Sequence, residues 1–434
     1  MKRLPGFNKE HFENDKYALS RVWVIAEAAL EYFIALLTSG AYLAKITSAL
    51  NFSDSLTGIL SSFVTLGCIF QLGSGIVFRK ASRVKGRVIA FQGIYQLLFV
   101  VIYLTPVLNA HANVRTGIFL VAYVSAYVLI NLVRSQKNSW MLSLIDDNKR
   151  GVFTAKKEIV SLISGMLFTY VMGSVIDNLE YAGNVRGAFV ACAVVIFVIN
   201  AIHMTTLLLT RERDEKDGGK ENESGSIWTL VKNKKVMSVV LLCVSFYIAH
   251  YAAVPFFGAY QIKELDFSMR FISILSILYS VIRAVFSPFM GKLADKRGFV
   301  RMAFVCFLVE AMGFVVVTFT TPENGKWMYS LYNVAYAISM AGINSALLNI
   351  VFSYAPKEMR AQAIALNYAL CGVAGFLSTC AASRVVDHIQ ASGNMIFGIH
   401  MYPQQFMSAV AFVLMLVSIA YTYFGVIAKE KKEG

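Results

Sequence analysis

Two glutamates, Glu27 and Glu31, lie four residues apart within a long apolar stretch near the start of the chain. Residues four apart share one face of a helix, so the two carboxyl groups are expected side by side. A charged side chain near a bilayer centre costs about 2.5 to 3.5 kcal/mol on insertion scales, and such groups usually face a cavity or a partner. Either glutamate is therefore a candidate for proton binding. An ion pair between helices and, for Glu27, a place near the membrane interface are the alternatives.

A second polar stripe follows the apolar stretch 114–137. Tyr123, Tyr127, Asn131 and Arg134 recur at steps of four, four and three residues, which places them on one helix face. Arg134 is a candidate partner for Glu31 or for an anionic group of a ligand. The alternative is an arginine at the helix end whose charged head reaches the membrane surface.

The second half of the chain repeats this combination of rings and amides. His250 is a candidate for proton binding, because histidine changes charge near neutral pH, and a packing histidine is the alternative. Aromatic rings beside amides suit a polar ring-shaped or amphipathic ligand such as a sugar or glycoside. The candidate ligand contacts in this half are Tyr247, Tyr251, Tyr332, Asn333 and Tyr336.

The composition requires a membrane around these residues. The 434 residues are 57% hydrophobic and 15% charged, whereas a soluble domain is about a quarter charged. We predict an all-α membrane protein with twelve transmembrane helices. The predicted spans are 19–49, 55–78, 87–108, 114–137, 152–176, 187–210, 236–262, 269–290, 299–320, 327–352, 361–386 and 404–427.

The positive charge is distributed in a way that sets the topology. Most of the 40 Lys and Arg residues fall at the two ends and in alternate loops between the predicted spans. The positive-inside rule therefore places both termini in the cytoplasm of a multi-pass protein of the cell (plasma) membrane. Because this charge is spread along the chain and not gathered in one basic domain, nucleic-acid binding is not expected.

A charged linker divides the predicted spans six and six. Residues 211–226 combine alternating charges with Gly and Ser, and residues 227–236 resemble a short interfacial helix. We therefore predict an N-terminal bundle over 1–210, a linker over 211–235 and a C-terminal bundle over 236–434. Arg150 and Arg360 take matching places in the two halves, and the Tyr123 and Tyr127 pair recurs as Tyr332 and Tyr336, which indicates a duplication.

One motif resembles a known family. Residues 291–298 read G-x3-D-K-R-G, with Gly291, Asp295, Lys296, Arg297 and Gly298, and lie between two predicted spans. This is similar to the gate motif of the major facilitator superfamily. The resemblance implies two pseudo-symmetric six-helix bundles in which helices 1, 4, 7 and 10 line a central cavity. It also implies a cytoplasmic gate, to which Arg150 and Arg360 are assigned. The corresponding first-half loop departs from the family pattern, with Arg79 in place of the acid.

These features together favour a secondary transporter that works by alternating access. We expect a proton-coupled carrier of a small organic solute, sugar-like in preference to drug-like, in a monomer without a cofactor. Arg134-Ser135-Gln136 is similar to part of a drug-antiporter motif, so proton-driven multidrug or metabolite efflux is the alternative. A non-transporting membrane sensor or a channel fits less well. The chain carries no phosphate-binding loop and no H-E-x-x-H motif, so ATP drive and enzyme activity are not expected.

Overall fold

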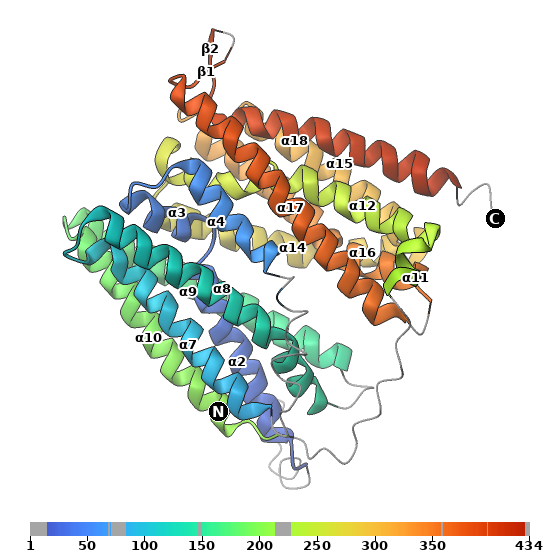
Figure 1. The fold of residues 1–434 in the computed structure, drawn as a ribbon, viewed down its shortest axis with the longest axis horizontal. Coiled ribbons are helices and arrows are strands. Elements are labelled where there is room, and N and C mark those ends of the chain that lie inside the picture. The colour runs from blue at the N-terminus through green and yellow to red at the C-terminus, as the bar shows by residue number, and fades with distance from the viewer. Residues whose placement is uncertain are drawn as a thin grey trace, which may run out of the picture. The chain divides into compact units, whose positions relative to one another are not determined.

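A computed structural model describes residues 15–67, 70, 84–145, 150–212, 227–356, 359–396 and 398–429. The chain divides into two compact units, and each is described by itself (Figure 1). Unit 1 comprises Met1–Thr38 and Phe70–Gly219, and unit 2 comprises Ser39–Ile69 and Lys220–Gly434.

Unit 1 is a bundle of long helices. Helix α7 packs against α8 and α10, while α2 packs against α9 and α10. A buried group that includes Val24, Val88, Val133 and Leu207 joins α2, α7, α8 and α10. The helices are α2 (Ala18–Leu37), α7 (Lys85–Leu104), α8 (Ala112–Ser143), α9 (Arg150–Tyr181) and α10 (Val185–Leu209).

Unit 2 contains the remaining helices and one small hairpin. Helix α15 packs against α16 and α18, and α17 packs against α4 and α12. The helices are α3 (Gly40–Ala49), α4 (Asp54–Leu66), α11 (Ile227–Lys232), α12 (Lys234–Tyr251), α13 (Phe257–Ala259), α14 (Met269–Arg297), α15 (Phe299–Thr318), α16 (Gly325–Tyr354), α17 (Arg360–Ala391) and α18 (Pro403–Ala420). Strands β1 (Met395–Ile396) and β2 (Ile399–His400) pair antiparallel.

The first predicted span, 19–49, is two helices. Helices α2 and α3 are bent by 43° at a short break, and Gly40 at the start of α3 has a φ of 54°, which a glycine adopts without strain. The break separates α2 in unit 1 from α3 and α4 in unit 2. Residues 39–69 thus pack with the second half of the chain, and the division into bundles 1–210 and 236–434 stays a prediction. Residues 213–226 of the predicted linker lie outside the described part.

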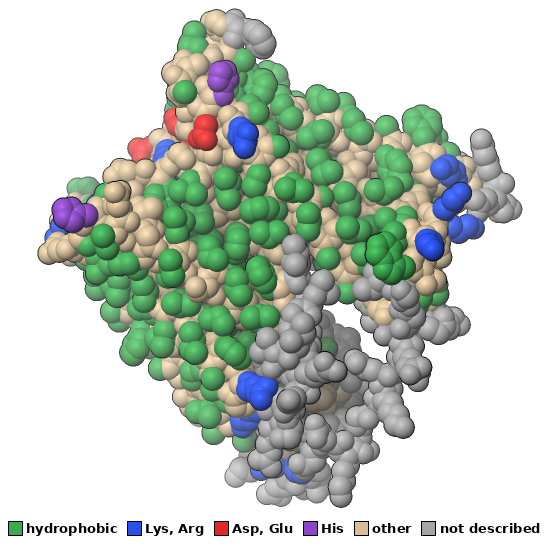
Figure 2. All heavy atoms as spheres, viewed as in Figure 1, with side chains coloured by type: hydrophobic (Ala, Val, Ile, Leu, Met, Phe, Trp, Pro, Cys, Tyr) green, Lys and Arg blue, Asp and Glu red, His purple; other side chains and the backbone are tan. Residues whose placement is uncertain are grey.

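The helices have the length and apolar character that a membrane requires. Ten described helices can cross a bilayer, or eleven if α2 and α3 form one span. Helix α4 is described only to Leu66, so the rest of the predicted span 55–78 is not covered. Hydrophobic side chains cover the helix flanks on the face shown in Figure 2, and the charged side chains there lie towards helix ends. The prediction of an all-α membrane protein with about twelve spans is confirmed.

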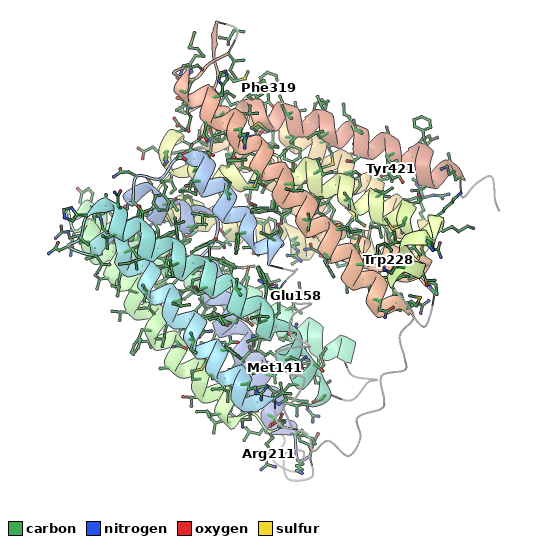
Figure 3. All side chains as sticks on the ribbon, viewed as in Figure 1. Met141, Glu158, Arg211, Trp228, Phe319 and Tyr421 are labelled. Carbon is green, nitrogen blue, oxygen red and sulfur yellow. The ribbon has the colours of Figure 1, made fainter. Side chains whose placement is uncertain are left out.

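The seventh predicted span is interrupted at Pro255, as its lack of a backbone N–H predicts. Helix α12 ends at Tyr251, and a 3₁₀ turn over Val254–Phe256 precedes α13 and a π-helical turn over Tyr260–Glu264. The short helix α11 precedes α12 where the sequence predicts an interfacial helix. Its Trp228 is 72% exposed (Figure 3).

Candidate functional site

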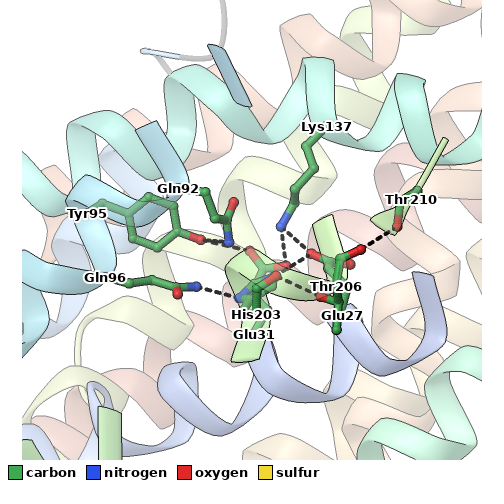
Figure 4. A network of polar contacts seen from close by, with 9 residues as sticks. All are labelled: Glu27, Glu31, Gln92, Tyr95, Gln96, Lys137, His203, Thr206 and Thr210. Carbon is green, nitrogen blue, oxygen red and sulfur yellow. Dashed lines mark hydrogen bonds and ion pairs between the residues drawn. The ribbon is translucent and has the colours of Figure 1, made fainter. Parts of the chain in front are cut away.

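Unit 1 encloses a charged cluster at the two glutamates that the sequence singles out. Lys137 Nζ lies 2.8 Å from Glu27 Oε1 and 2.5 Å from Glu31 Oε2. The Lys137 and Glu27 side chains are each 3% exposed, whereas that of Glu31 is 30% exposed. Figure 4 shows Lys137 reaching from α8 to both carboxylates on α2. Glu27 is therefore enclosed by protein, whereas Glu31 is the carboxylate of the cluster that the protein leaves partly exposed.

Helix geometry explains why one lysine meets both acids. The four-residue spacing places Glu27 and Glu31 one turn apart on α2, and a lysine side chain reaches the gap between them. Helix α8 runs to Ser143, six residues beyond the predicted end of the span at 137, so Lys137 is an interior residue of the helix. A buried ammonium or carboxylate without a partner raises the free energy of the folded state. The contact of Lys137 with both carboxylates offsets this cost.

Helices α7 and α10 supply a second layer of polar contacts. His203 Nε2 lies 3.3 Å from Glu27 Oε1, and Gln96 Nε2 lies 2.7 Å from His203 Nδ1. An amide that donates to Nδ1 leaves the proton of a neutral ring on Nε2, which then donates to Glu27. On the other side of the cluster, the Tyr95 hydroxyl donates to Glu31 Oε1 over 3.3 Å, and Gln92 donates to Tyr95.

The charges of this cluster do not cancel. Two carboxylates face one ammonium, so the cluster carries one net negative charge when His203 is neutral. One added proton brings the total to zero. Glu31 is the partly exposed carboxylate of the cluster.

The sequence identifies the two acids but assigns Glu31 a different partner. The side chain of Arg134 is exposed, and the basic group at Glu31 is Lys137. Sequence reasoning misses Lys137, His203, Gln92 and Gln96. Gln92 and Gln96 could have been found from the sequence, because they are two polar residues four apart within the apolar helix α7.

The other first-half candidates pack inside unit 1. Tyr123 and Tyr127 are buried with ring centroids 4.7 Å apart, and the Tyr127 hydroxyl donates to the Thr38 carbonyl oxygen over 3.4 Å. Asn131 Nδ2 donates to the Tyr127 carbonyl oxygen over 2.8 Å. Contact of these residues with a solute stays a prediction.

The second-half candidates form a continuous group of rings in unit 2. Tyr336 stacks on Tyr332 at 5.7 Å and on His250 at 6.0 Å, and Tyr247 stacks on Tyr251 at 5.5 Å. Asn333 Nδ2 donates to the Leu275 carbonyl oxygen on α14 over 2.6 Å. His250 also contacts Glu310 on α15.

The residues of the gate motif lie partly in a helix. Gly291, Asp295, Lys296 and Arg297 form the exposed last turns of α14, where the sequence predicts a loop, and Gly298 ends the helix with a φ of 84°. Arg360 lies 4.0 Å above the Phe352 ring. The side chain of Arg150 and the loop around Arg79 lie outside the described part. A gating role for these residues stays a prediction.

The sequence profile of the Major Facilitator Superfamily matches residues 28–379. The chain belongs to this superfamily. It is a membrane transporter by this membership, as the resemblance of residues 291–298 predicts. No curated protein sequence matches the chain.

Solved structures of superfamily transporters share the fold. A point mutant of the nucleoside transporter NupG has a TM-score of 0.69 at 13% identity, covering 93% of this chain and 99% of that one. A bacterial homologue of the human lysosomal transporter Spinster has a TM-score of 0.68 at 12% identity, covering 93% and 95%. A D-xylose-proton symporter has a TM-score of 0.65 at 13% identity, covering 94% and 98%. These similarities concern the fold alone.

Proposed function

We propose that this transporter is a proton-coupled secondary carrier that moves a small organic solute by alternating access. The observation that carries the proposal is the Lys137 ammonium bound between Glu27 and Glu31, with one carboxylate enclosed and the other partly exposed. Coupling requires a group inside the membrane that takes up a proton from one side and releases it to the other. The partial exposure of Glu31 and its contact with Lys137 support this residue as that group.

A proton on Glu31 changes what Lys137 contacts. With both carboxylates ionised, the lysine is shared between Glu27 and Glu31 and the cluster has one negative charge. With Glu31 neutral, Lys137 and Glu27 form a balanced pair, and the cluster has no net charge. The energetic cost of enclosing the cluster is therefore lower in the protonated form, which gives the two forms different preferences for the open and closed states.

The solute is proposed to be a sugar or glycoside. Tyr247, Tyr251, Tyr332 and Tyr336 present ring faces and hydroxyl groups from α12 and α16, which suit a ring-shaped polar molecule. Transporters of D-xylose and of nucleosides are among the proteins with this fold. Both kinds of solute contain a polar ring.

Efflux of a cationic drug-like compound is the second candidate. The net negative charge at Glu31 supports it, because a cationic solute can neutralise the cluster in place of a proton. Competition between solute and proton for one carboxylate produces antiport. The two candidates differ in the direction in which the solute moves when a proton gradient is applied.

We further propose the remaining features of topology and assembly. The bias of Lys and Arg in the sequence supports cytoplasmic termini and a place in the plasma membrane. A monomer is proposed, with two related halves divided at the linker 211–235.

The test begins with the purified protein and a thermal-shift screen of sugars, nucleosides, amino acids and hydrophobic cations, since a bound ligand raises the melting temperature. Solute-driven proton movement is then measured in liposomes for wild type, Glu31→Gln and the exposed control Glu323→Gln. We expect Glu31→Gln to lose proton movement and Glu323→Gln to keep it. Normal coupling in Glu31→Gln contradicts the proposed role of this residue.

A further inference from the structure

Unit 2 contains a second buried acid-base pair, which the proposed role of Glu31 does not involve. His250 Nδ1 on α12 lies 2.6 Å from Glu310 Oε1 on α15, and the side chains are 9% and 0% exposed. Glu310 lies near the middle of the apolar helix Phe299–Thr318. An ionisable residue at this depth is costly, so its place in the helix calls for a functional explanation.

The contacts of Glu310 require a hydrogen between its carboxyl group and His250. Ser339 Oγ donates to Glu310 Oε2 over 2.9 Å, and His250 Nδ1 contacts the other carboxylate oxygen. A nitrogen and an oxygen 2.6 Å apart need a hydrogen between them, because two bare acceptors repel each other. That hydrogen belongs to an imidazole or imidazolium N–H, or to a protonated carboxyl group.

The net charge of the His250–Glu310 pair favours the forms that hold one extra proton. An ionised Glu310 beside a neutral His250 leaves one unbalanced negative charge in a fully buried place, which is strongly unfavourable. One proton added to the pair gives either an imidazolium-carboxylate pair or two neutral groups. Both forms have no net charge, so the pair gains or loses one proton as a unit.

The surroundings of the pair are aromatic and weakly acidic. The His250 ring lies against Phe246 at 5.5 Å and Tyr251 at 5.0 Å, in addition to Tyr336. Helix α17 contributes hydroxyl groups, from Ser378 and Thr379, that bind the backbone of α12. The Tyr421 hydroxyl, beyond α18, contacts the far end of α12 at Ser238. The titratable side chains described around the pair are Tyr251 on α12, Cys306 on α15, Tyr332 and Tyr336 on α16 and, against Tyr336, Tyr279 on α14.

These side chains add no charge next to the pair at pH 7. Tyrosine and cysteine are neutral at pH 7 in their ordinary state, so they do not balance the charge of Glu310. The ring of His250, stacked on Tyr336, also connects the pair to the group of rings proposed to contact the solute. A proton gained or lost here therefore changes the charge directly beside those rings.

We propose that His250 and Glu310 form a second proton-binding site, so that each unit of the transporter binds one proton. The inference rests on the proposed function for its role in transport, in which two protons move with each solute. The proton comes from water on one side of the membrane and returns to water on the other. Proton binding itself needs no solute, and this permits a separate test.

The test is a pH jump on proteoliposomes without solute, with the displaced charge recorded on a solid-supported membrane. Variants Glu310→Gln and Glu31→Gln are compared with wild type and with the double variant. If the two sites are independent, each single variant loses about half of the displaced charge and the double variant loses nearly all of it. Glu323→Gln, which removes an exposed carboxyl group of the same unit, is the matched control and retains most of the charge.

The outcomes separate this site from the one in unit 1. A Glu310→Gln variant that displaces as much charge as wild type overturns the second site and leaves the role of Glu31 intact. If Glu31→Gln has no effect while Glu310→Gln removes the charge, the second site stands and the proposed role of Glu31 fails.

A second measurement avoids dependence on the folding of Glu310→Gln. In wild-type protein labelled with ¹⁵N-histidine, the His250 signal is identified by its loss in His250→Gln. A proton gained by the pair changes the ring nitrogens in either form, from imidazole to imidazolium or from one neutral tautomer to the other. We therefore expect the ¹⁵N shifts of the His250 ring to change with pH in wild type. Ring ¹⁵N shifts that stay constant across the pH range overturn the proposal.

Discussion

Lys137 Nζ lies 2.8 Å from Glu27 Oε1, and neither side chain is more than 3% exposed. This contact joins α8 to α2 inside unit 1, at a place where water cannot replace a lost partner. Replacing both residues and removing only one of them therefore have different effects on stability. The intact pair adds little compared with an apolar pair of similar volume, but a single unpaired charge left behind is strongly destabilising.

The first prediction concerns removal of this lysine. Lys137→Met leaves Glu27 and Glu31 without their common ammonium group, and we expect unfolding to become easier by about 3 to 5 kcal/mol. The measurement is the melting temperature of the purified protein in detergent. Arg134→Met, on the same helix but exposed, is the control and is expected to change stability by less than about 0.5 kcal/mol. Equal melting temperatures for the two variants contradict the charge cluster.

The second prediction separates the two glutamates. Glu27 is enclosed and contacts both Lys137 and His203, whereas Glu31 is 30% exposed. We therefore expect Glu27→Gln to lower the melting temperature more than Glu31→Gln, and Glu31→Gln to reduce proton movement more than Glu27→Gln. Thermal unfolding and liposome proton assays on the same preparations compare them. The reverse ranking in both assays rules out this division of roles.

Much of unit 1 follows from the sequence, and the partner of Glu31 shows where prediction stops. The apolar period identifies the helices and the four-residue step pairs Glu27 with Glu31. It does not identify Lys137, because a lysine at the end of an apolar stretch is equally well read as a residue near the membrane surface. Only the continuation of α8 to Ser143 places it inside. His203 is likewise a single polar residue whose contact with Glu27 depends on how α10 packs against α2.

The placement of residues 39–69 depends in the same way on tertiary packing. The sequence predicts a single span over 19–49, since its apolar character continues through the break. The structure turns at Ser39 and Gly40, and α4 packs on α17 and the turn at Pro255. Hydrophobic pattern records how apolar a segment is, but not which other apolar segment it contacts.

The third prediction concerns the polar contact that fixes α4 within unit 2. Asp54 is fully buried, with Lys263 Nζ 2.7 Å from Oδ1 and Gln404 Nε2 donating to Oδ2 over 2.8 Å. Asp54→Asn removes the negative charge that Lys263 faces. In addition, the NH2 group of the asparagine faces either Lys263 Nζ or Gln404 Nε2, both of which are donors themselves. We expect destabilisation of about 1 to 3 kcal/mol by thermal unfolding.

The matched control for this change is Asp266→Asn. Asp266 is exposed and has a φ of 47°, a conformation that asparagine accepts readily. It is expected to leave the melting temperature unchanged. A loss in Asp266→Asn as large as that in Asp54→Asn indicates that the charge contact is not the cause.

The fourth prediction tests the close approach of α3 and α13. A Cβ atom added at Gly258 would lie 2.7 Å from the Gly40 carbonyl oxygen, which belongs to the backbone and cannot rotate away. Gly258→Ala must therefore push the two segments apart, and we expect a loss of about 1 to 3 kcal/mol. The same substitution at Gly117 in α8 meets no atom within 4 Å. Gly117→Ala should be neutral or more stable by about 0.5 to 1 kcal/mol, because alanine favours a helix. Since both variants add one methyl group to a glycine, opposite shifts in melting temperature isolate the contact with Gly40 as the cause, and equal shifts refute it.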